Sequence, residues 1–249
     1  MENIQQIAAR YKPGTVPDAG LTNTFAPARN FAPTPLNDFR FHHLNEQWMV
    51  QRLRRALEKA TEWQRCQRTQ PIAGLSLVLT GSLGTGKTTI AHNLMSVFNQ
   101  TAVVEGMSGE TVTVARCRMF DATGLMKIVA ERGDFTNTLR REKCFVIDDL
   151  GTEDFGTETY TPSTEQITSA RQHRYGRFID WCYRSGKSVI ITSNVPLVTR
   201  DEGDVTVNAE FVNIIGARSW DRLLQMAGGY MIDLTGLPSY RPEILKGVF

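Results

Sequence analysis

Residues 75–91 read LSLVLTGSLGTGKTTIA, and they carry the clearest fold signal in the sequence. The opening part of this stretch, 75–80, is mostly apolar and predicts a short buried strand. The part from Gly81 to Thr88 matches the pattern G-x-x-x-x-G-K-S/T, and residues suited to a helix follow it. A glycine-rich loop between a strand and a helix is the context in which this pattern binds nucleotide phosphates.

The chemistry of the loop assigns a role to each of its parts. Its glycines allow a tight turn that aims backbone N–H groups at phosphate oxygens, and the following helix adds its positive N-terminal end. We expect the Lys87 ammonium to reach the β- and γ-phosphates of ATP, and the Thr88 hydroxyl to ligate Mg²⁺. The alternative is a chance glycine-rich loop. The expected nucleotide-binding residues are Gly81, Gly84, Thr85, Gly86, Lys87, Thr88 and Thr89.

Apolar runs and helical patterns alternate on the C-terminal side of the loop. Buried strands between helices specify a parallel sheet that is covered on both faces. The expected fold class is therefore α/β, a P-loop NTPase sheet flanked by helices. Strands are expected at 75–80, 144–148, 188–192 and 229–234, helices at 87–98, 121–132, 135–141, 165–185 and 208–226, and a hairpin at 101–106 and 111–119.

Polar residues stand where two of these strands end. Residues 144–149 read CFVIDD, and a parallel strand would deliver its last residues to the edge of the sheet that holds the loop. We expect Asp148 to hold Mg²⁺ and Asp149 to orient the attacking water. Asn194, after the next strand, is a candidate contact for the γ-phosphate or that water. The alternatives are two surface acids at 148–149 and a turn-forming Asn before Val-Pro.

The N-terminal part differs in composition from the rest of the chain. Half of the 10 prolines fall within the first 35 residues, which predicts an extended arm over 1–43 with one short helix near 2–11. Phe25 and Phe31 stand in repeated Phe-Ala-Pro units, which either dock a partner or pack on their own domain. The ATPase domain is expected over 44–249. It opens with a basic helix at 44–68, whose charges form either a solvated face or a DNA- or partner-facing surface.

Composition limits the classes of partner. Lys and Arg number 28 against 26 Asp and Glu, so binding of nucleic acid would need a local basic patch, either at 52–68 or at 171–187. Tyr175, Phe178 and Trp181 lie within the second run and are expected in the core; the alternative is that they stack on bases. The four cysteines are far apart, which predicts reduced thiols and no zinc site. No secretory signal or membrane span is expected, and the expected location is cytoplasmic.

Five stretches together resemble the DnaC/IstB group of AAA+ ATPases. They are LTGSLGTGKTTIA (79–91), CFVIDDLGTE (144–153), SVIITSNVP (188–196), GARSWDRL (216–223) and LPSYRP (237–242). The resemblance implies Mg²⁺-dependent ATP hydrolysis between the subunits of a homo-oligomeric ring or spiral. It also implies non-specific binding of single- or double-stranded DNA. The implied roles are the loading of a replicative helicase or, alternatively, transposition targeting with a transposase as partner.

The same resemblance implies roles for three arginines. Arg222 would be the arginine finger that reaches the γ-phosphate held by a neighbouring subunit, and Arg218 would assist it. Arg241 resembles the sensor arginine that contacts phosphate within its own subunit. The alternatives are an exposed helix face for the first two and an ordinary tail residue for the third.

The sequence departs from the group in several places. Asp149 replaces the Glu of many related ATPases, so turnover is expected to be slow or to wait for a partner. A nucleotide-gated assembly protein that hardly hydrolyses ATP is therefore a third interpretation. An extra hairpin at 101–119, an enlarged loop at 152–168 and little or no C-terminal lid are also expected. The unusual arm is expected to choose the partner.

Overall fold

The computed structural model describes residues 36, 39, 44–69, 72–98, 117–131, 134–153, 163–201 and 204–240. Most of the expected arm, with Phe25, Phe31 and the helix near 2–11, lies outside the described residues. So do Arg241 and most of the hairpin expected at 101–119. These expectations stay predictions.

A five-stranded parallel sheet in the order β2-β3-β4-β1-β7 forms the centre of the protein. The central strands are almost wholly buried, as expected for a parallel sheet with helices on both faces. The α/β class predicted from the alternating pattern is confirmed. The strands are β1 (Leu77–Thr80), β2 (Cys117–Asp121), β3 (Cys144–Leu150), β4 (Ser188–Ser193) and β7 (Met231–Asp233).

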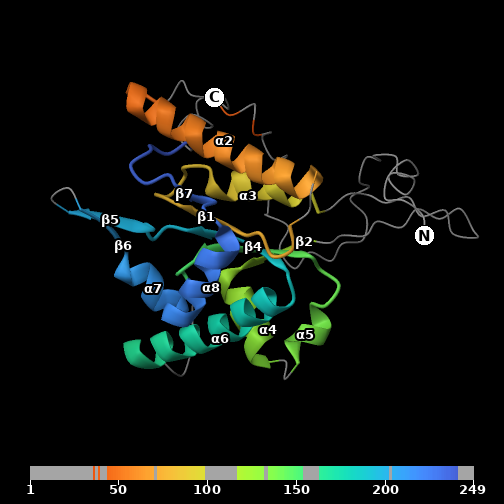
Figure 1. Cartoon of the computed structure of the whole chain (residues 1–249). Helices are drawn as coiled ribbons and strands as arrows, with labels where there is room; N and C mark the ends of the chain where they lie inside the picture. The colour runs from red at the N-terminus through yellow and green to blue at the C-terminus, as the bar shows by residue number, and fades with distance from the viewer. Residues whose placement is uncertain are drawn as a thin grey trace, which may run out of the picture.

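Helices cover the two faces of the sheet unequally (Figure 1). One face carries α2 (Gln47–Thr69) and α3 (Lys87–Met95), and the other carries the remaining helices. Successive side chains of β1 point to opposite faces of the sheet and so contribute to both core layers. Leu77 and Leu79 pack on the α2 side, and Val78 packs on the opposite side. The second layer is α4 (Ala122–Glu131), α5 (Phe135–Thr138), α6 (Thr164–Arg184), α7 (Ala209–Ile215) and α8 (Ala217–Ala227).

The helix α2 buries its apolar stripe and uses part of its basic face within the domain. Leu53, Ala60 and Trp63 are fully buried. On its basic face, Arg52 lies 2.5 Å from Asp233 Oδ2 at the end of β7, and Lys59 donates to the carbonyl of Met231 at 3.3 Å. These two cations therefore attach the helix to the edge strand.

Three elements differ from the sequence-based expectation. A single helix was expected at 208–226, but the structure has two, α7 and α8. Gly216 lies between them with φ 83°, which is not a helical conformation, so it ends the first helix. Residues 117–121, partly assigned to a hairpin, form a strand that pairs in parallel with β3. An antiparallel hairpin of β5 (Val198–Asp201) and β6 (Asp204–Val207) was not expected, because its short strands are rich in polar residues. It projects from the body of the molecule in Figure 1.

Of the helices in the described ranges, none combines the length and hydropathy that a membrane-spanning segment requires.

Trp63→Ala should destabilise the protein strongly. Its indole is fully buried beside Phe98, with ring centroids 6.0 Å apart. Truncation leaves a cavity between α2 and the sheet, and we expect a loss of about 3–5 kcal/mol in the free energy of unfolding. Urea denaturation measures it. Trp48→Ala in the same helix is the control, because Trp48 is 44% exposed. It should cost no more than about 1 kcal/mol. Equal losses would contradict the packing of α2.

Candidate nucleotide-binding site

The ends of four parallel strands form the candidate site. The glycine-rich loop follows β1, Asp148 and Asp149 lie near the end of β3, Asn194 follows β4, and Asp233 ends β7. Because the strands are parallel, their carboxyl ends meet at one edge of the sheet, where open α/β folds bind ligands. The three polar positions expected around the loop are therefore brought to the same edge.

The loop rests on a segment near the end of the described chain. The Tyr240 N–H donates to the Gly84 carbonyl at 2.9 Å, and the Phe39 and Tyr240 rings meet edge to face at 5.9 Å. Gly84 has φ 78°, and a Cβ there would lie 2.0 Å from Ser239 Oγ. Only glycine fits this position. Arg241 follows Tyr240 directly but lies outside the described residues, so its sensor role stays a prediction.

Lys87 is held inside the loop. Its ammonium donates to the carbonyls of Gly81 and Ser82, each at 2.8 Å, and to Asn194 Oδ1 at 2.9 Å. Only 5% of the residue is exposed. These bonds hold the ammonium against the carbonyls of the glycine-rich loop, and its role toward the β- and γ-phosphates stays a prediction. Asn194 thus lies at the candidate site, where its side chain contacts Lys87.

A chain of hydrogen bonds joins Thr88, Asp148 and Thr192. The Thr88 hydroxyl lies 3.0 Å from Asp148 Oδ1, and the Thr192 hydroxyl donates to the same oxygen at 2.5 Å. The Thr192 hydroxyl also accepts the Asp149 N–H at 2.9 Å. Thr192 therefore fixes both aspartates. The sequence analysis missed this role, although a threonine that ends an apolar strand just before Asn194 was a signal for it.

The donor set fits Mg²⁺. A hydroxyl and a carboxylate from neighbouring elements supply the hard oxygen ligands that this ion prefers, and it keeps its remaining positions for water and phosphate. Within the described ranges, no cluster of three or more His, Cys, Asp or Glu residues could hold a metal ion by itself. Thr88 and Asp148, in contact with each other, are the residues that would hold Mg²⁺ here.

Burial makes the Asp148 charge costly. It raises the pKa of the Asp148 carboxyl, with a further increase from the Asp149 charge, against the hydrogen bonds from Thr192 and Thr88. His92 lies one helical turn after Thr88 on α3, close to the candidate site. The sequence analysis did not name it as a site residue, although its i+4 spacing from Thr88 places it on the same side of the helix. Burial lowers the pKa of His92, and the nearby Asp148 carboxylate opposes that decrease.

Asp149 has an unusual backbone. Its φ is 55°, in the left-handed region, and the pairing of β3 with β4 shifts register between Ile147 and Leu150. In a regular strand, successive side chains would point to opposite faces of the sheet. The irregularity removes this constraint, so that Asp148 and Asp149 are both half-buried at the strand end.

Arg222 contacts residues of its own chain in this structure. Its guanidinium forms an ion pair with Asp180 of α6 and lies 5.7 Å from the centre of the Tyr183 ring, and only 16% of the side chain is exposed. Arg218, one turn earlier on α8, is exposed. The expected finger role acts across subunits, so it stays a prediction. In a finger role, Arg222 would first have to leave Asp180.

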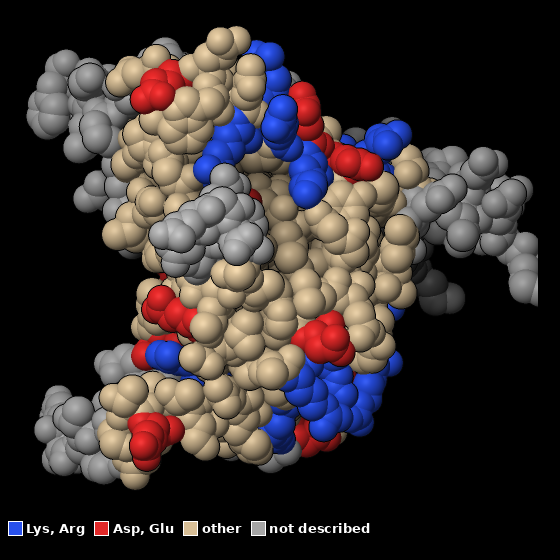
Figure 2. Space-filling view, turned by 60° about the vertical axis from the view of Figure 1, so that its left-hand side comes forward, with Lys and Arg blue, Asp and Glu red and all other residues tan. Residues whose placement is uncertain are grey.

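The second expected basic patch is partly used inside the fold. Lys187 is buried and donates to the carbonyls of Arg140 and Glu142, at 2.9 and 2.6 Å. Arg171 is paired with the buried Glu153 at 2.8 Å. Figure 2 shows the basic side chains of one face in separate areas, with acidic side chains beside them. As expected, Tyr175 and Phe178 are core residues, and Trp181 packs partly buried against them. They are not an exposed stacking platform.

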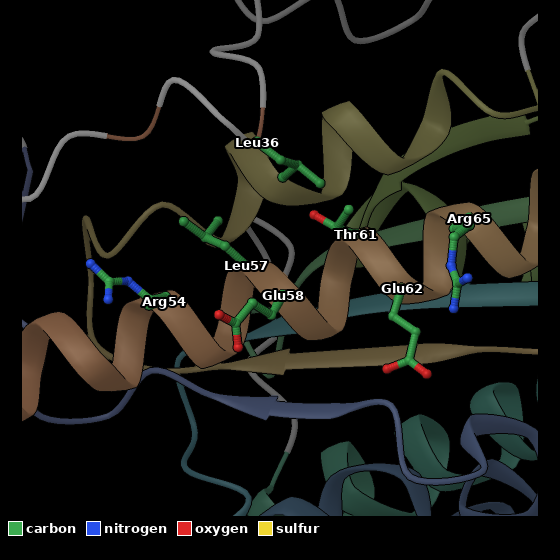
Figure 3. A pocket seen from close by; sticks show the side chains of 7 residues that line it. All are labelled: Leu36, Arg54, Leu57, Glu58, Thr61, Glu62 and Arg65. Atoms are coloured by element: carbon green, nitrogen blue, oxygen red, sulfur yellow. The ribbon is translucent and has the colours of Figure 1, made fainter.

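A hollow on the outer side of α2 is separate from the loop (Figure 3). Its charged lining is of mixed sign, so this side of α2 is not a continuous basic surface for DNA. The lining residues are Leu36, Arg54, Leu57, Glu58, Thr61, Glu62 and Arg65.

Comparison with known proteins gives a match in three dimensions. No family model matches the sequence, and no curated protein matches it. The crystal structure of the DnaC helicase loader is 19% identical with a TM-score of 0.53, over 80% of this chain and 96% of that chain. DnaA from Aquifex aeolicus, bound to AMPPCP, is 15% identical with a TM-score of 0.49, over 88% of this chain and 55% of that chain.

The DnaC match shows a shared fold. It confirms the expected α/β fold, a P-loop NTPase sheet flanked by helices, and it shows that this fold is shared with the DnaC helicase loader.

Asp148→Asn should stabilise the nucleotide-free protein at neutral pH. Folding raises the pKa of Asp148 above its ordinary value of 3.8, so native stability is lost as the pH rises from there through the native pKa. Asn keeps an acceptor for Thr88 and Thr192 without the charge. We therefore expect the variant to unfold at a higher temperature than the wild type at neutral pH. The difference should shrink as the pH is lowered toward 3.8.

Thermal unfolding followed by circular dichroism over this pH range, without nucleotide or Mg²⁺, measures the effect. The control is Asp221→Asn, because Asp221 is exposed on α8. It should change the unfolding temperature little at any pH. An Asp148→Asn protein that is less stable than wild type at neutral pH would show that burial is not the dominant cost.

Proposed function

We propose that this protein is a Mg²⁺-dependent AAA+ ATPase that helps to load a replicative helicase onto DNA. The observation that carries the ATPase part is the joint geometry at the sheet edge. Lys87 and Asn194 are in contact at 2.9 Å, and Thr88, Asp148 and Thr192 are linked by hydrogen bonds beside them. Phosphoryl transfer needs a cation that binds the phosphates, a pair of residues that binds the metal and polar groups at the strand end. This edge of the sheet brings all three together.

Each residue has a defined task in this proposal. Lys87 exchanges its loop carbonyls for the β- and γ-phosphates, while Asn194 keeps it oriented. Thr88 and Asp148 hold Mg²⁺, which neutralises phosphate charge when bound. Asp149 accepts a hydrogen bond from the attacking water and takes its proton. Its carboxylate is one methylene shorter than that of Glu, which supports slow turnover.

The helicase-loading part is supported by the fold shared with the DnaC helicase loader. A homo-oligomer that binds DNA non-specifically through phosphates, with the arm over 1–43 choosing the partner, completes the proposal. No feature of the described residues favours the alternative, a transposition ATPase. A pull-down with the immobilised full-length chain in the presence of ATP separates the two functions. Retention of a replicative helicase is the expected result, and retention of a transposase instead would favour the alternative.

Lys87→Ala should abolish tight ATP binding and hydrolysis. The substitution removes the ammonium that the loop presents to the β- and γ-phosphates. Titration with a fluorescent ATP analogue and a phosphate-release assay measure the two losses. Lys127→Ala is the matched control, because Lys127 is exposed on α4, and it should bind and hydrolyse ATP like wild type. Equal affinity in the Lys87→Ala protein would remove the nucleotide-site assignment.

Arg222→Ala should bind ATP but lose most hydrolysis, since an arginine finger contributes roughly 10³–10⁵ in rate in related NTPases. Mixing it with Lys87→Ala protein should restore part of the activity. At a mixed interface, the Lys87→Ala subunit supplies Arg222, and the Arg222→Ala subunit supplies an intact loop. The ATPase rate against mixing ratio, with DNA present, is the measurement. Normal activity of Arg222→Ala alone would refute the finger role and leave Arg222 as a partner of Asp180.

A further inference from the structure

The turn that follows Asp149 is held in a defined conformation. Asp149 has φ 55° and is the only non-glycine residue with positive φ in the part of the chain that the structure describes. Its carbonyl accepts two hydrogen bonds from Thr152, from the N–H at 3.2 Å and from the hydroxyl at 2.7 Å. Left-handed backbone is unfavourable for a residue with a side chain, so it persists only when neighbouring contacts enforce it.

The carboxylate of Glu153 closes this turn. Its Oε1 accepts the Gly151 N–H at 3.0 Å. Gly151 has φ 103°, a left-handed conformation that residues with a side chain rarely adopt, so the turn depends on glycine at this position. Asp149 is therefore fixed on its N-terminal side by Thr192 and on its C-terminal side by the turn that Glu153 holds.

Glu153 is anchored by α6. Its side chain is 0% exposed, and Oε2 lies 2.8 Å from Arg171 Nε. The Tyr175 hydroxyl, one helical turn after Arg171, donates to Oε1. A buried carboxylate with these partners is a costly arrangement that an apolar core would often replace without loss of stability. Fold stability alone is thus a weak reason for its presence.

We propose that Glu153 is a positioning residue for hydrolysis. It holds the Asp149–Glu153 turn so that Asp149 keeps its left-handed backbone, with its carboxylate beside the phosphates, and Arg171 and Tyr175 hold Glu153. This role rests on the proposed function, because it assigns the water-orienting task to Asp149. It predicts that loss of the Glu153 acceptor lowers kcat while ATP binding, which depends on Lys87, is kept.

The test uses two double variants of the full-length chain. Glu153→Ala with Arg171→Met removes the acceptor and its cation together, so no unpaired charge stays buried. Glu153→Gln with Arg171→Met removes the same charges but keeps an amide oxygen for the Gly151 N–H. Glu165→Ala, at an exposed position on α6, is the control and should behave like wild type.

We expect the Ala double variant to lose about tenfold or more in kcat, since small misplacements of reacting groups are costly. Its Kd for ATP should stay within about threefold of wild type, and the Gln double variant should recover most of the kcat. Amide hydrogen exchange should become faster at residues 149–153 in the Ala double variant only, at equal global stability.

Turnover within about threefold of wild type in the Ala double variant would overturn the proposal. So would a loss of kcat that the Gln double variant does not recover, or unchanged exchange at residues 149–153. Exchange is measured without nucleotide, so it tests Glu153 even if the wild type fails to hydrolyse ATP. That failure, by contrast, would count against the proposed ATPase function.

Discussion

The parallel pairing of β4 between β1 and β3 is the constraint on which the site depends. Leu79 pairs with Thr192, and Ile147 pairs with Ile191, so the three strands end at the same level. Because they run in one direction, the loop after β1 and the polar residues that end β3 and β4 emerge together. The strands are buried on both faces, and a different strand order would separate the loop from these polar residues while leaving each local pattern intact.

The edge strand β7 supports the loop from the other side. Arg52 of α2 donates to the Asp233 carbonyl at 3.0 Å, and the Leu234 N–H donates to the Thr80 carbonyl at 2.7 Å. A Cβ on Gly81 would lie 2.8 Å from the Leu234 backbone. The helix before the glycine-rich loop thus helps to fix the chain that lies against the loop. Arg52, one of the basic residues expected either on a solvated face or on a DNA- or partner-facing surface, has a structural use within the domain.

Residues of α6 form buried or half-buried ion pairs in both halves of the helix. Near its N-terminal half, Arg171 pairs with Glu153. Near its C-terminal end, Asp180 pairs with the largely buried Arg222 of α8. Charges used in this way are not available to phosphates of a nucleic acid. A run of basic residues in the sequence therefore overstates the basic surface, and any DNA contact must rely on cations that the fold leaves exposed.

The loop, the strands that flank it and the acidic pair at 148–149 could be predicted from the sequence, because each depends on local spacing and on the periodicity of apolar residues. Which side chains meet could not be predicted in this way, because it depends on how the elements pack. Asn194 reaches Lys87 across 107 positions, and Thr192 reaches Asp148 across 44. These contacts follow from strand order and from the irregular end of β3, and neither is written in a local pattern. The pairing of Arg222 with Asp180 has the same origin, since it requires α8 to pack on α6.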